Sequence, residues 1–589
     1  MISFLYFYTF LNLFKNSFAC TNLIVTKGAS AEGHNMFTYS ADAYQLFGDL
    51  YHFPAGDHPK DEKIKIYDWI TDDYYGEIPQ VEHTYNVVGN MNENNVAIGE
   101  TTWGGREECI DTTGIIDYGN LIYITLQRAK NARDAIDIMV NLCNTYGYRS
   151  SGESFTIADL DEIWVMDLIG KGKPTGTAGT RVVYVAQKIP DGSISGHANL
   201  PRTTTVGTEK ETITWKYSDD VLKFAKEKGW SNADSLEHFD FTDAYCPIKG
   251  EGFEEAGKSH VRQCDGRIWA FFASVLGEEA MNIYNDYILG RNMDNRLPFS
   301  MKVPDGIKKV TLNDLMNAMG HHFEGTILDP TKDIGAGQSS SPYRNRPNVY
   351  EATVSDPDPV TQKYVHDRGA GQQQTGWSFV AQLRPKSSAH GAASAGSVLW
   401  FAPDDASLSI HIPIYPQINY VPSCLTRDHA SSQMFSMNSV FWVNNLVANW
   451  VYQNYEVLKP VAKAKQQEMR NYFRASLRQA DATAMSLLSR DEKVGKEFLT
   501  QMCNVWAEKA LTEWRGLFEE MFRVYFDGAR HNTIKGKKIP SVDFLPPRSD
   551  WYKLIVDETG DRFLWPEEQT STNGSDTKPK VSKKMRLVL

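Results

Sequence analysis

One cysteine in this chain stands where its own backbone nitrogen can serve as its base. Cys20 directly follows Ser17-Phe18-Ala19, whose small residues three places and one place before the Ala19–Cys20 bond form the pattern that signal peptidase cleaves. Cleavage there leaves Cys20 with a free α-amine of pKa about 8 beside a thiol of pKa about 8.5. The amine can then accept the thiol proton at neutral pH, and the thiolate can attack a carbonyl carbon. We therefore predict that Cys20 is a nucleophile that becomes active only after cleavage.

The segment before Cys20 has the composition of a secretory signal peptide. Residues 1–14 form an apolar run too short to span a bilayer, and Lys15 follows this run rather than preceding it. We predict that residues 1–19 are a signal peptide and that the mature protein is exported to a periplasmic, cell-surface or extracellular location. A buried N-terminal helix or strand is the alternative interpretation of the same residues.

Two other interpretations of Cys20 stay open at this level. Lipoprotein precursors also carry a cysteine directly after the cut, although here Ser17 stands where an aliphatic residue is usual and bulky Phe18 follows it. A lipidated surface module that binds ligands without turnover is therefore a competing function, and an ordinary core cysteine is another. The mass of the exported protein separates the first of these from an enzyme, because a lipid adduct contradicts a free Cys20 amine.

Short strands and two helices are expected to position Cys20. Residues 21–26 and 34–39 flank a turn and predict a hairpin with Cys20 at a strand end. Apolar residues recur at three- and four-residue intervals in 118–129 and 132–146, which predicts amphipathic helices, and Gly147 ends the second. Further strands are predicted at 86–88, 96–102, 154–158, 163–168 and 181–186.

The rest of the chain alternates between loop-rich and helical stretches. Residues 331–376 are expected to be loop, strands are predicted at 378–383, 397–401 and 408–414, and 441–526 has a helical pattern. The alternation of strand-rich and helix-rich blocks predicts a layered α/β or α+β domain with helical additions. The predicted organisation is a signal peptide (1–19), a catalytic domain (20–425), a helical region packed on it (426–567) and a disordered tail (568–589).

Composition and charge argue against several function classes. The 589 residues carry a net charge of −12, which argues against a nucleic acid partner, and no later stretch has the ~20 apolar residues of a membrane span. None of the seven cysteines forms a CxxC pair, so zinc ribbons and thioredoxin-type sites are not expected. His321-His322-Phe323-Glu324 lacks the HExxH spacing and a third ligand, and we interpret it as structural.

A series of short motifs resembles the dipeptidase A family of cysteine peptidases, which belongs to the N-terminal-nucleophile hydrolase superfamily. The resemblance runs from Cys20 to about Tyr420, and it depends on the order and spacing of the motifs rather than on any one of them. The motifs are Ala19-Cys20-Thr21-Asn22-Leu23-Ile24-Val25, Lys27-Gly28-Ala29-Ser30 with Gly33, Gly89-Asn90-Met91-Asn92-Glu93, Ala97-Ile98-Gly99-Glu100-Thr101-Thr102, Asp117-Tyr118-Gly119, Gly152-Glu153-Ser154-Phe155, Gly196-His197-Ala198-Asn199 and Glu324-Gly325-Thr326.

The resemblance implies a fold, an activity and a set of catalytic residues. The fold is an α+β four-layer αββα sandwich with the nucleophile at the end of a central strand, and the activity is hydrolysis of dipeptides with no metal or organic cofactor. Cys20 corresponds to the nucleophile, and Asp42 to the acid that lies near the nucleophile's amine. Asn199 corresponds to the asparagine that donates to an oxyanion hole, although an Asx-turn before Pro201 would also explain it.

Four further residues are candidates for binding the substrate or supporting the nucleophile. Relatives carry an arginine three places before the acid, where this chain has Tyr39, so any charge that the arginine supplies must come from elsewhere. Arg267 resembles a cation found near the nucleophile in the superfamily, with a solvated or core arginine as the alternative. Glu100 and Glu153 could each bind the free amine of a dipeptide, and the sequence does not choose between them.

The leading hypothesis is an exported dipeptidase whose partners are small peptides. An acyl amidohydrolase of the penicillin or bile-salt acylase type shares the superfamily and the nucleophile, and is the closest alternative. The state of assembly stays open, with a homo-oligomer compatible with the sequence.

Overall fold

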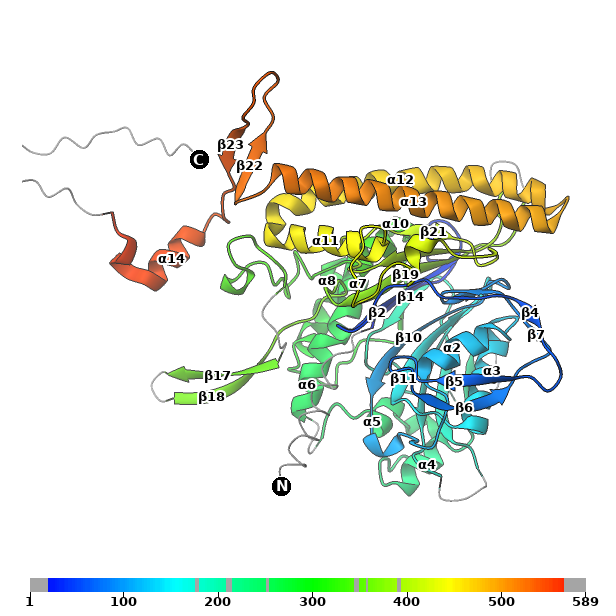
Figure 1. Ribbon diagram of the computed structural model, residues 1–589. Coiled ribbons are helices and arrows are strands. Elements are labelled where there is room, and N and C mark those ends of the chain that lie inside the picture. Colours follow the sequence, from blue (N-terminus) through cyan, green and yellow to red (C-terminus); the bar gives the residue numbers. More distant parts are fainter. Residues whose placement is uncertain are drawn as a thin grey trace, which may run out of the picture.

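The computed structural model of the chain describes residues 20–174, 179–207, 214–250, 254–343, 349–355, 359–388 and 393–565. The predicted signal peptide (1–19) and the predicted tail (568–589) lie outside the described residues. Two antiparallel sheets pack face to face, and helices cover the outer face of each (Figure 1). The predicted α+β class and four-layer αββα sandwich are therefore confirmed.

The first sheet holds the strand that follows Cys20. Every residue of β1, β2 and β19 is buried, because one face packs on the second sheet and the other lies under helices. The predicted strand at 408–414 is confirmed only in its second half, since residues around Asp405 form a turn in which its carbonyl accepts from the N–H groups of Leu408 and Ser409. In order, the strands are β16 (Ser300–Lys302), β14 (Ser193–His197), β1 (Asn22–Val25), β2 (Asn35–Asp42), β19 (Thr375–Leu383), β20 (Val398–Pro403) and β21 (Ile412–Ile414).

The second sheet faces the first through β10, which contacts β1 and β2. Its predicted strands are all present, each within a few residues of its predicted bounds. In order, the strands are β15 (Trp215–Tyr217), β13 (Val182–Lys188), β12 (Ile163–Gly170), β11 (Gly152–Ala158), β10 (Ala97–Gly104), β9 (Met91–Asn92), β8 (Val87–Val88) and β3 (His52–Phe53).

Helices form the two outer layers. α2 (Tyr118–Leu126) and α3 (Ala132–Tyr146) lie on the second sheet, while α7 (Asp265–Leu276) and α10 (Leu312–Met319) lie on the first, against β14, β1 and β2. The side chain of Asn131 accepts from an N–H in the first turn of α3, and Gly147 ends this helix with a φ of 79°, a value that favours glycine. Both predicted helices are confirmed.

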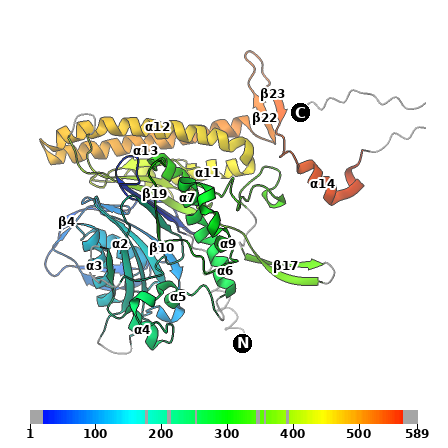
Figure 2. The same cartoon turned by 180° about the vertical axis from the view of Figure 1, so that it is seen from behind.

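Three C-terminal helices extend across the first sheet on the side of β20 and β21. They are α11 (Val440–Gln453), α12 (Tyr455–Leu488) and α13 (Glu492–Val524), and the last two form a long antiparallel pair in both views (Figures 1 and 2). A buried ion pair between Arg384 of the segment after β19 and Asp481 of α12, with N–O distances of 2.8 and 3.1 Å, attaches this pair to the sandwich. The predicted helical pattern is confirmed; the domain boundary at 425 stays a prediction.

The remaining elements lie around the sandwich. The prediction of loop throughout 331–376 was wrong, because β17 (Val349–Ser355) and β18 (Pro359–Val365) form a hairpin that projects from the body (Figure 1). No helix in the described ranges is long and apolar enough to cross a membrane. The other elements are β4 (Gly56–Asp57), β5 (Lys63–Tyr67), β6 (Tyr74–Pro79), β7 (His83–Thr84), β22 (Ala529–Asn532), β23 (Ser541–Phe544), α4 (Val221–Glu227), α5 (Phe241–Tyr245), α6 (Glu254–Gln263), α8 (Glu278–Met281), α9 (Asn285–Ile288), α14 (Trp551–Thr559) and the 3₁₀ turns Glu107–Cys109, Leu236–His238, Asn282–Tyr284, Ile334–Ala336, Ser423–Leu425 and Gly560–Phe563.

Gly99 of β10 sets how closely the two sheets approach at the site. A Cβ there would lie 2.4 Å from Oδ1 of Asn22 and 2.9 Å from the ring of Phe37, both on the opposite sheet. We expect Gly99→Ala to destabilise the fold by about 1–3 kcal/mol, as overpacking usually does, and to lower the midpoint of thermal unfolding. Gly516→Ala on α13 is the matched control, because no atom lies within 4 Å of its added Cβ. An unchanged midpoint for Gly99→Ala would contradict the close approach.

Candidate active site

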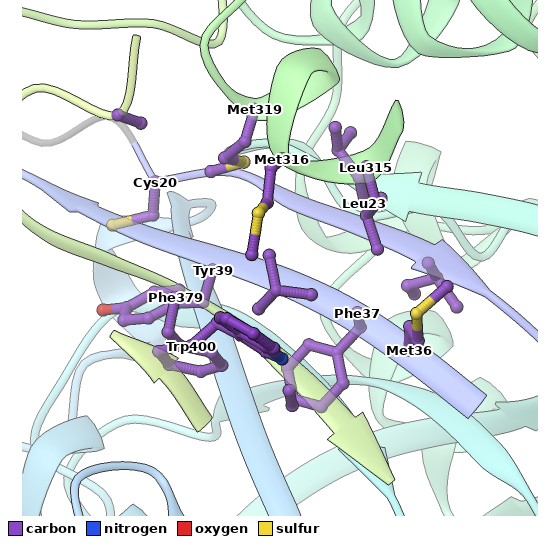
Figure 3. Packing of buried hydrophobic residues seen from close by; sticks show 14 of the residues in the cluster. Cys20, Leu23, Met36, Phe37, Tyr39, Leu315, Met316, Met319, Phe379 and Trp400 are labelled. Carbon is purple, nitrogen blue, oxygen red and sulfur yellow. The ribbon is translucent and has the colours of Figure 1, made fainter. Parts of the chain in front are cut away.

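Cys20 lies at the head of β1, between the two strands that carry its neighbours. β1 pairs with β14, whose chain continues to Asn199, and with β2, which ends at Asp42. The side chain is buried at 4% exposure, and its sulfur points to the same end of the apolar cluster as the hydroxyl of Tyr39 (Figure 3). The thiol therefore lies between the ends of the strands that lead to Asn199 and Asp42.

Asp42 is a fully buried acid beside the thiol. It accepts hydrogen bonds from the hydroxyls of Thr375 (2.6 Å) and Ser40 (3.0 Å), and its backbone N–H donates to the Cys20 sulfur. Burial raises the pKa of Asp42 to about 7, against the opposing effect of these hydrogen bonds and of Arg267 and Arg368. A cation beside this carboxyl would stabilise its ionised form and so lower its pKa.

Glu100 and Glu153 face the thiol from the second sheet. Thr102 pairs with Glu153 across β10 and β11, so Glu100, two residues before Thr102, lies diagonally across from Glu153 on the same face. Glu100 accepts from the Tyr39 hydroxyl (2.6 Å) and Glu153 from the Thr102 hydroxyl (2.7 Å). Burial raises the pKa of both carboxyls, and the charge of Glu100 raises the pKa of Glu153 further, which favours one proton held between them.

The electrostatic surroundings keep the thiol protonated while Cys20 is joined to Ala19. Burial raises the pKa of the Cys20 thiol well above its ordinary value, and the negative charges of Glu100 and Asp42 raise it further. A positive charge on the Cys20 nitrogen would oppose all three effects.

Asn199 adopts a backbone conformation that is uncommon for its residue type. Its φ is 57°, and its side-chain amide donates to the carbonyl of Thr102 (2.6 Å) and accepts from Arg267 (2.9 Å). The Asx-turn considered from the sequence is not formed, because Pro201 has no N–H to donate. One N–H of the amide is left beyond the bond to Thr102, which gives Asn199 the donor that an oxyanion would need.

Arg267 is an internal brace rather than a surface cation. It is 1% exposed, and its guanidinium donates to the carbonyl of Cys20 (2.8 Å), to the Thr21 hydroxyl (2.8 Å) and to the side chain of Asn199. Bonds to the carbonyls of Gln263 (2.9 Å) and Ala198 (3.3 Å) complete its set of five. Arg267 therefore holds Cys20 and Asn199 in one rigid unit.

His197 ties the two sheets together next to this unit. Its ring bonds the hydroxyls of Thr101 on β10 and Thr156 on β11, at 2.7 Å each. Burial lowers its pKa to about 3, so the ring is neutral. His197 thus positions Asn199 two residues further along the chain.

Tyr39 does not replace the missing arginine as a cation near Asp42. Its hydroxyl donates to Glu100, and its ring packs on those of Trp377 and Phe379. The positive charges that act on Asp42 are those of Arg267 and Arg368. Sequence reasoning missed Arg368 and also Thr375, because both lie within residues 331–376, which were expected to be loop.

A cleft lies beside the site, next to the segment before β19. It is lined by His322, Phe323, Arg368, Gly369 and Gly371 among others, and a second hollow lined by Arg267, Phe323 and Ala370 adjoins the same segment. Arg267, which donates to the Cys20 carbonyl, lines the second hollow, and neither lining includes Cys20 itself.

The His321–Glu324 motif contributes to packing. His322 lies within 3.3 Å of the hydroxyls of Tyr343, Tyr452 and Tyr455, and Glu324 accepts from Tyr455 and Lys459. This network connects the segment after α10 to α11 and α12.

Comparisons with known proteins agree with the motifs. Residues 50–468 match the model of Peptidase family C69. A protein named Dipeptidase from Bifidobacterium longum (strain NCC 2705) is 20% identical over 469 residues, which cover 73% of this chain and 76% of that protein. Dipeptidase A from Lactobacillus helveticus is 21% identical over 482 residues, covering 76% and 85%.

A solved structure of penicillin V acylase from Agrobacterium tumefaciens matches 70% of this chain and 93% of the acylase chain, at 12% sequence identity. The TM-score of 0.25 is too low for this match to support a conclusion about the protein. The family match itself spans most of the chain, although it begins after Cys20. The resemblance predicted from the motifs is therefore confirmed, and the chain belongs to peptidase family C69, the dipeptidase A family of cysteine peptidases.

Proposed function

We propose that this protein is an exported dipeptidase in which signal cleavage frees Cys20 as the nucleophile. The observation that carries the proposal is the meeting of Cys20 with three buried carboxyl groups, Asp42, Glu100 and Glu153, at the head of β1. The names of the similar proteins support dipeptides as the substrate class. The Ser-Phe-Ala sequence before Cys20 supports export.

The proposed reaction uses the two ends of Cys20. The free amine takes the thiol proton, and Asp42 accepts a hydrogen bond from the resulting ammonium. The sulfur attacks the peptide carbonyl carbon, and the remaining N–H of Asn199 donates to the oxyanion, an interaction worth about 3 kcal/mol in comparable sites. The ammonium then returns its proton to the leaving amine as the C–N bond breaks. Water hydrolyses the thioester and restores the thiol.

The paired glutamates give the site a place for the substrate's own ammonium. Within the described residues, Oε2 of Glu100 and Oε2 of Glu153 have no conventional donor, although both atoms are buried. An ammonium between them would replace the shared proton and let both carboxyls ionise. A free amino terminus is therefore the feature that this pair would recognise.

The test is a substrate panel with the chain that begins at Cys20. We expect hydrolysis of free dipeptides, little hydrolysis of N-acylated amides of the acylase type, and none by Cys20→Ala. The intact mass of the exported protein should match a free Cys20 terminus. A lipid adduct on Cys20, or a preference for acyl amides, would overturn the proposal.

Removing one of the paired charges is expected to weaken substrate binding selectively. Glu153→Gln should raise KM for a free dipeptide by about 10- to 100-fold, because a charged hydrogen-bond acceptor is lost. The same dipeptide with an acetylated amine should be a poor substrate for both proteins and change little. Glu77→Gln, at an exposed position of β6, is the control. Equal losses on free and acetylated substrates would argue against an ammonium at Glu153.

A further inference from the structure

Basic side chains that the proposed reaction does not use meet in the interior, where the long C-terminal helices pack on the first sheet. Lys463 and Arg470 lie on α12, and His411 lies directly before β21. Arg470 is 3% exposed, and His411 is fully buried. A buried basic group is normally paired with an acid or a ligand, because an unpaired charge in the interior is costly.

Hydrogen bonds fix how α12 lies against the segment before β21. The ammonium of Lys463 donates to the carbonyl of Ser407. The side-chain amide of Gln466, one turn further along α12, donates to the carbonyls of Ser407 (3.2 Å) and Ser409 (2.6 Å). The contacts therefore advance along this segment as α12 advances, so the two elements run in the same direction.

Arg470 and His411 are the next residues in this register. Arg470 follows Gln466 by four positions and lies on the same face of α12, while His411 follows Ser409 by two positions. The two side chains are thus brought to the same place. Burial, and then the charge of Arg470, lower the pKa of His411 well below its ordinary value, which agrees with this placement. The ring is neutral and carries one N–H donor.

The guanidinium of Arg470 is only partly bonded. Its Nη1 donates to the side-chain oxygen of Asn317 of α10 at 2.6 Å. Its Nε and Nη2 are buried and have no hydrogen-bond partner among the described residues. These two nitrogens form the edge of a guanidinium that presents parallel N–H groups to an anion. Burial lowers the pKa of Arg470 to about 10, with no opposing effect from a carboxylate in the described ranges.

Two further polar groups at this place lack partners. Both ring nitrogens of His411 and the hydroxyl of Ser409 are buried and bond no atom of the described residues. We propose that Arg470 and His411 bind a small inorganic anion of the size of chloride between α12, α10 and the segment before β21. The anion accepts from the free edge of Arg470, from the N–H of His411 and from the Ser409 hydroxyl.

An anion suits this place better than water or a larger ligand. Water could accept the same hydrogen bonds, but it would leave the charge of Arg470 uncompensated in the interior. Arg470, His411 and Ser409 are each 3% exposed or less, so an organic acid or a peptide has no access to them. This inference does not depend on the proposed reaction, because none of these residues takes part in it.

The proposed anion gives the C-terminal helices a second charged attachment, in addition to the ion pair after β19. Through Asn317, Arg470 reaches α10, which packs on β1 and β2. Met316 and Met319 of α10 belong to the same apolar cluster as Cys20 (Figure 3). The anion therefore fastens α12 to the helix that covers the strand of the nucleophile, and the folded state should be more stable when it is bound.

The experiment measures thermal unfolding of the full chain in mixtures of sodium chloride and sodium gluconate at constant ionic strength. Gluconate is too large for a closed site. We expect the midpoint of the unaltered chain to rise by about 2 °C or more over a hundredfold increase in chloride, because a ligand that binds only the folded state stabilises it. Arg470→Met should lose this dependence. Arg478→Met, which removes an exposed arginine of the same helix, is the matched control and should keep it.

Bromide locates the anion directly in the unaltered protein and decides the matter if Arg470→Met does not fold. In crystals grown with bromide, an anomalous peak should lie within hydrogen-bonding distance of Nε and Nη2 of Arg470. A water molecule at that position without an anomalous peak would overturn the inference. A midpoint of the unaltered chain that does not depend on chloride, or an equal rise in Arg470→Met, would overturn it as well.

Discussion

A chain that retains residues 1–19 is expected to hydrolyse dipeptides at least about 1,000-fold more slowly than the chain that begins at Cys20. In the longer chain the Cys20 nitrogen is an amide without a basic lone pair, so the general base is absent. Burial, Glu100 and Asp42 also raise the pKa of the thiol, and no local ammonium opposes them. The measurement is the dipeptide hydrolysis rate of the two purified chains, with Cys20→Ser in the shorter chain as the reference for a weakened nucleophile.

Alkylation of the Cys20 thiol tests the role of the free α-amine without a substrate. Iodoacetamide should modify Cys20 faster in the shorter chain at pH 7, because the free ammonium favours the thiolate. The other six cysteines are also buried, and none of them gains an amine of its own on cleavage before Cys20, so their contribution should be the same in both chains. Cys20→Ala measures that contribution. Equal activity in the two chains would disprove the role of the α-amine, whatever the alkylation rates.

Local patterns were enough to predict most of the elements that carry the site. The helix at 132–146 was predicted to the residue, because it combines an apolar stripe with Gly147 after it. The strands at the centre of both sheets were recognised from β-branched and aromatic runs. Both β2 and β12 are buried along their whole length, although β2 carries Ser40 and Asp42 and β12 carries Asp167.

The hairpin of β17 and β18 could not be predicted in the same way. Its side chains are largely exposed, so no face of it needs to be apolar, and hydrophobic periodicity gives no signal. Glycine, serine and proline around it favoured loop instead. The error matters because Arg368 follows this hairpin directly, and a segment interpreted as loop offered no reason to place a cation at the site.

Which side chains contact one another at the site depends on the register between strands that are distant in sequence, and this register cannot be predicted from the sequence alone. Glu100 and Glu153 were both candidates for binding an amine, but only the pairing of Thr102 with Glu153 makes them one pair of carboxyls. Thr375 bonds Asp42 from 333 positions away. The residue types could therefore be predicted where a motif contained them, while their combined electrostatics required the fold.

Asp42→Asn is expected to abolish most activity and, at the same time, to stabilise the chain that retains residues 1–19. Activity should fall about 100-fold or more, because the ammonium of Cys20 loses its acceptor. The stability effect follows from burial, which raises the pKa of Asp42 to about 7 from its ordinary value of 3.8. Between these values the folded state holds a proton that the unfolded state has released, so the stability of the unaltered chain falls as pH rises through this window.

Asparagine does not titrate, so the gain in thermal midpoint from Asp42→Asn should be largest above pH 7 and vanish below about pH 4. The gain should be smaller in the chain that begins at Cys20, because there the ammonium pairs with Asp42 and lowers the pKa of its carboxyl. Ser40→Ala, which removes one hydrogen bond to Asp42 without removing its charge, is the matched control. Comparing the two chains at two pH values thus tests the ion pair between the Cys20 ammonium and Asp42. An equal gain in thermal midpoint in both chains would show that the freed amine does not reach Asp42. The proposed electrostatic support for a Cys20 thiolate would then be lost.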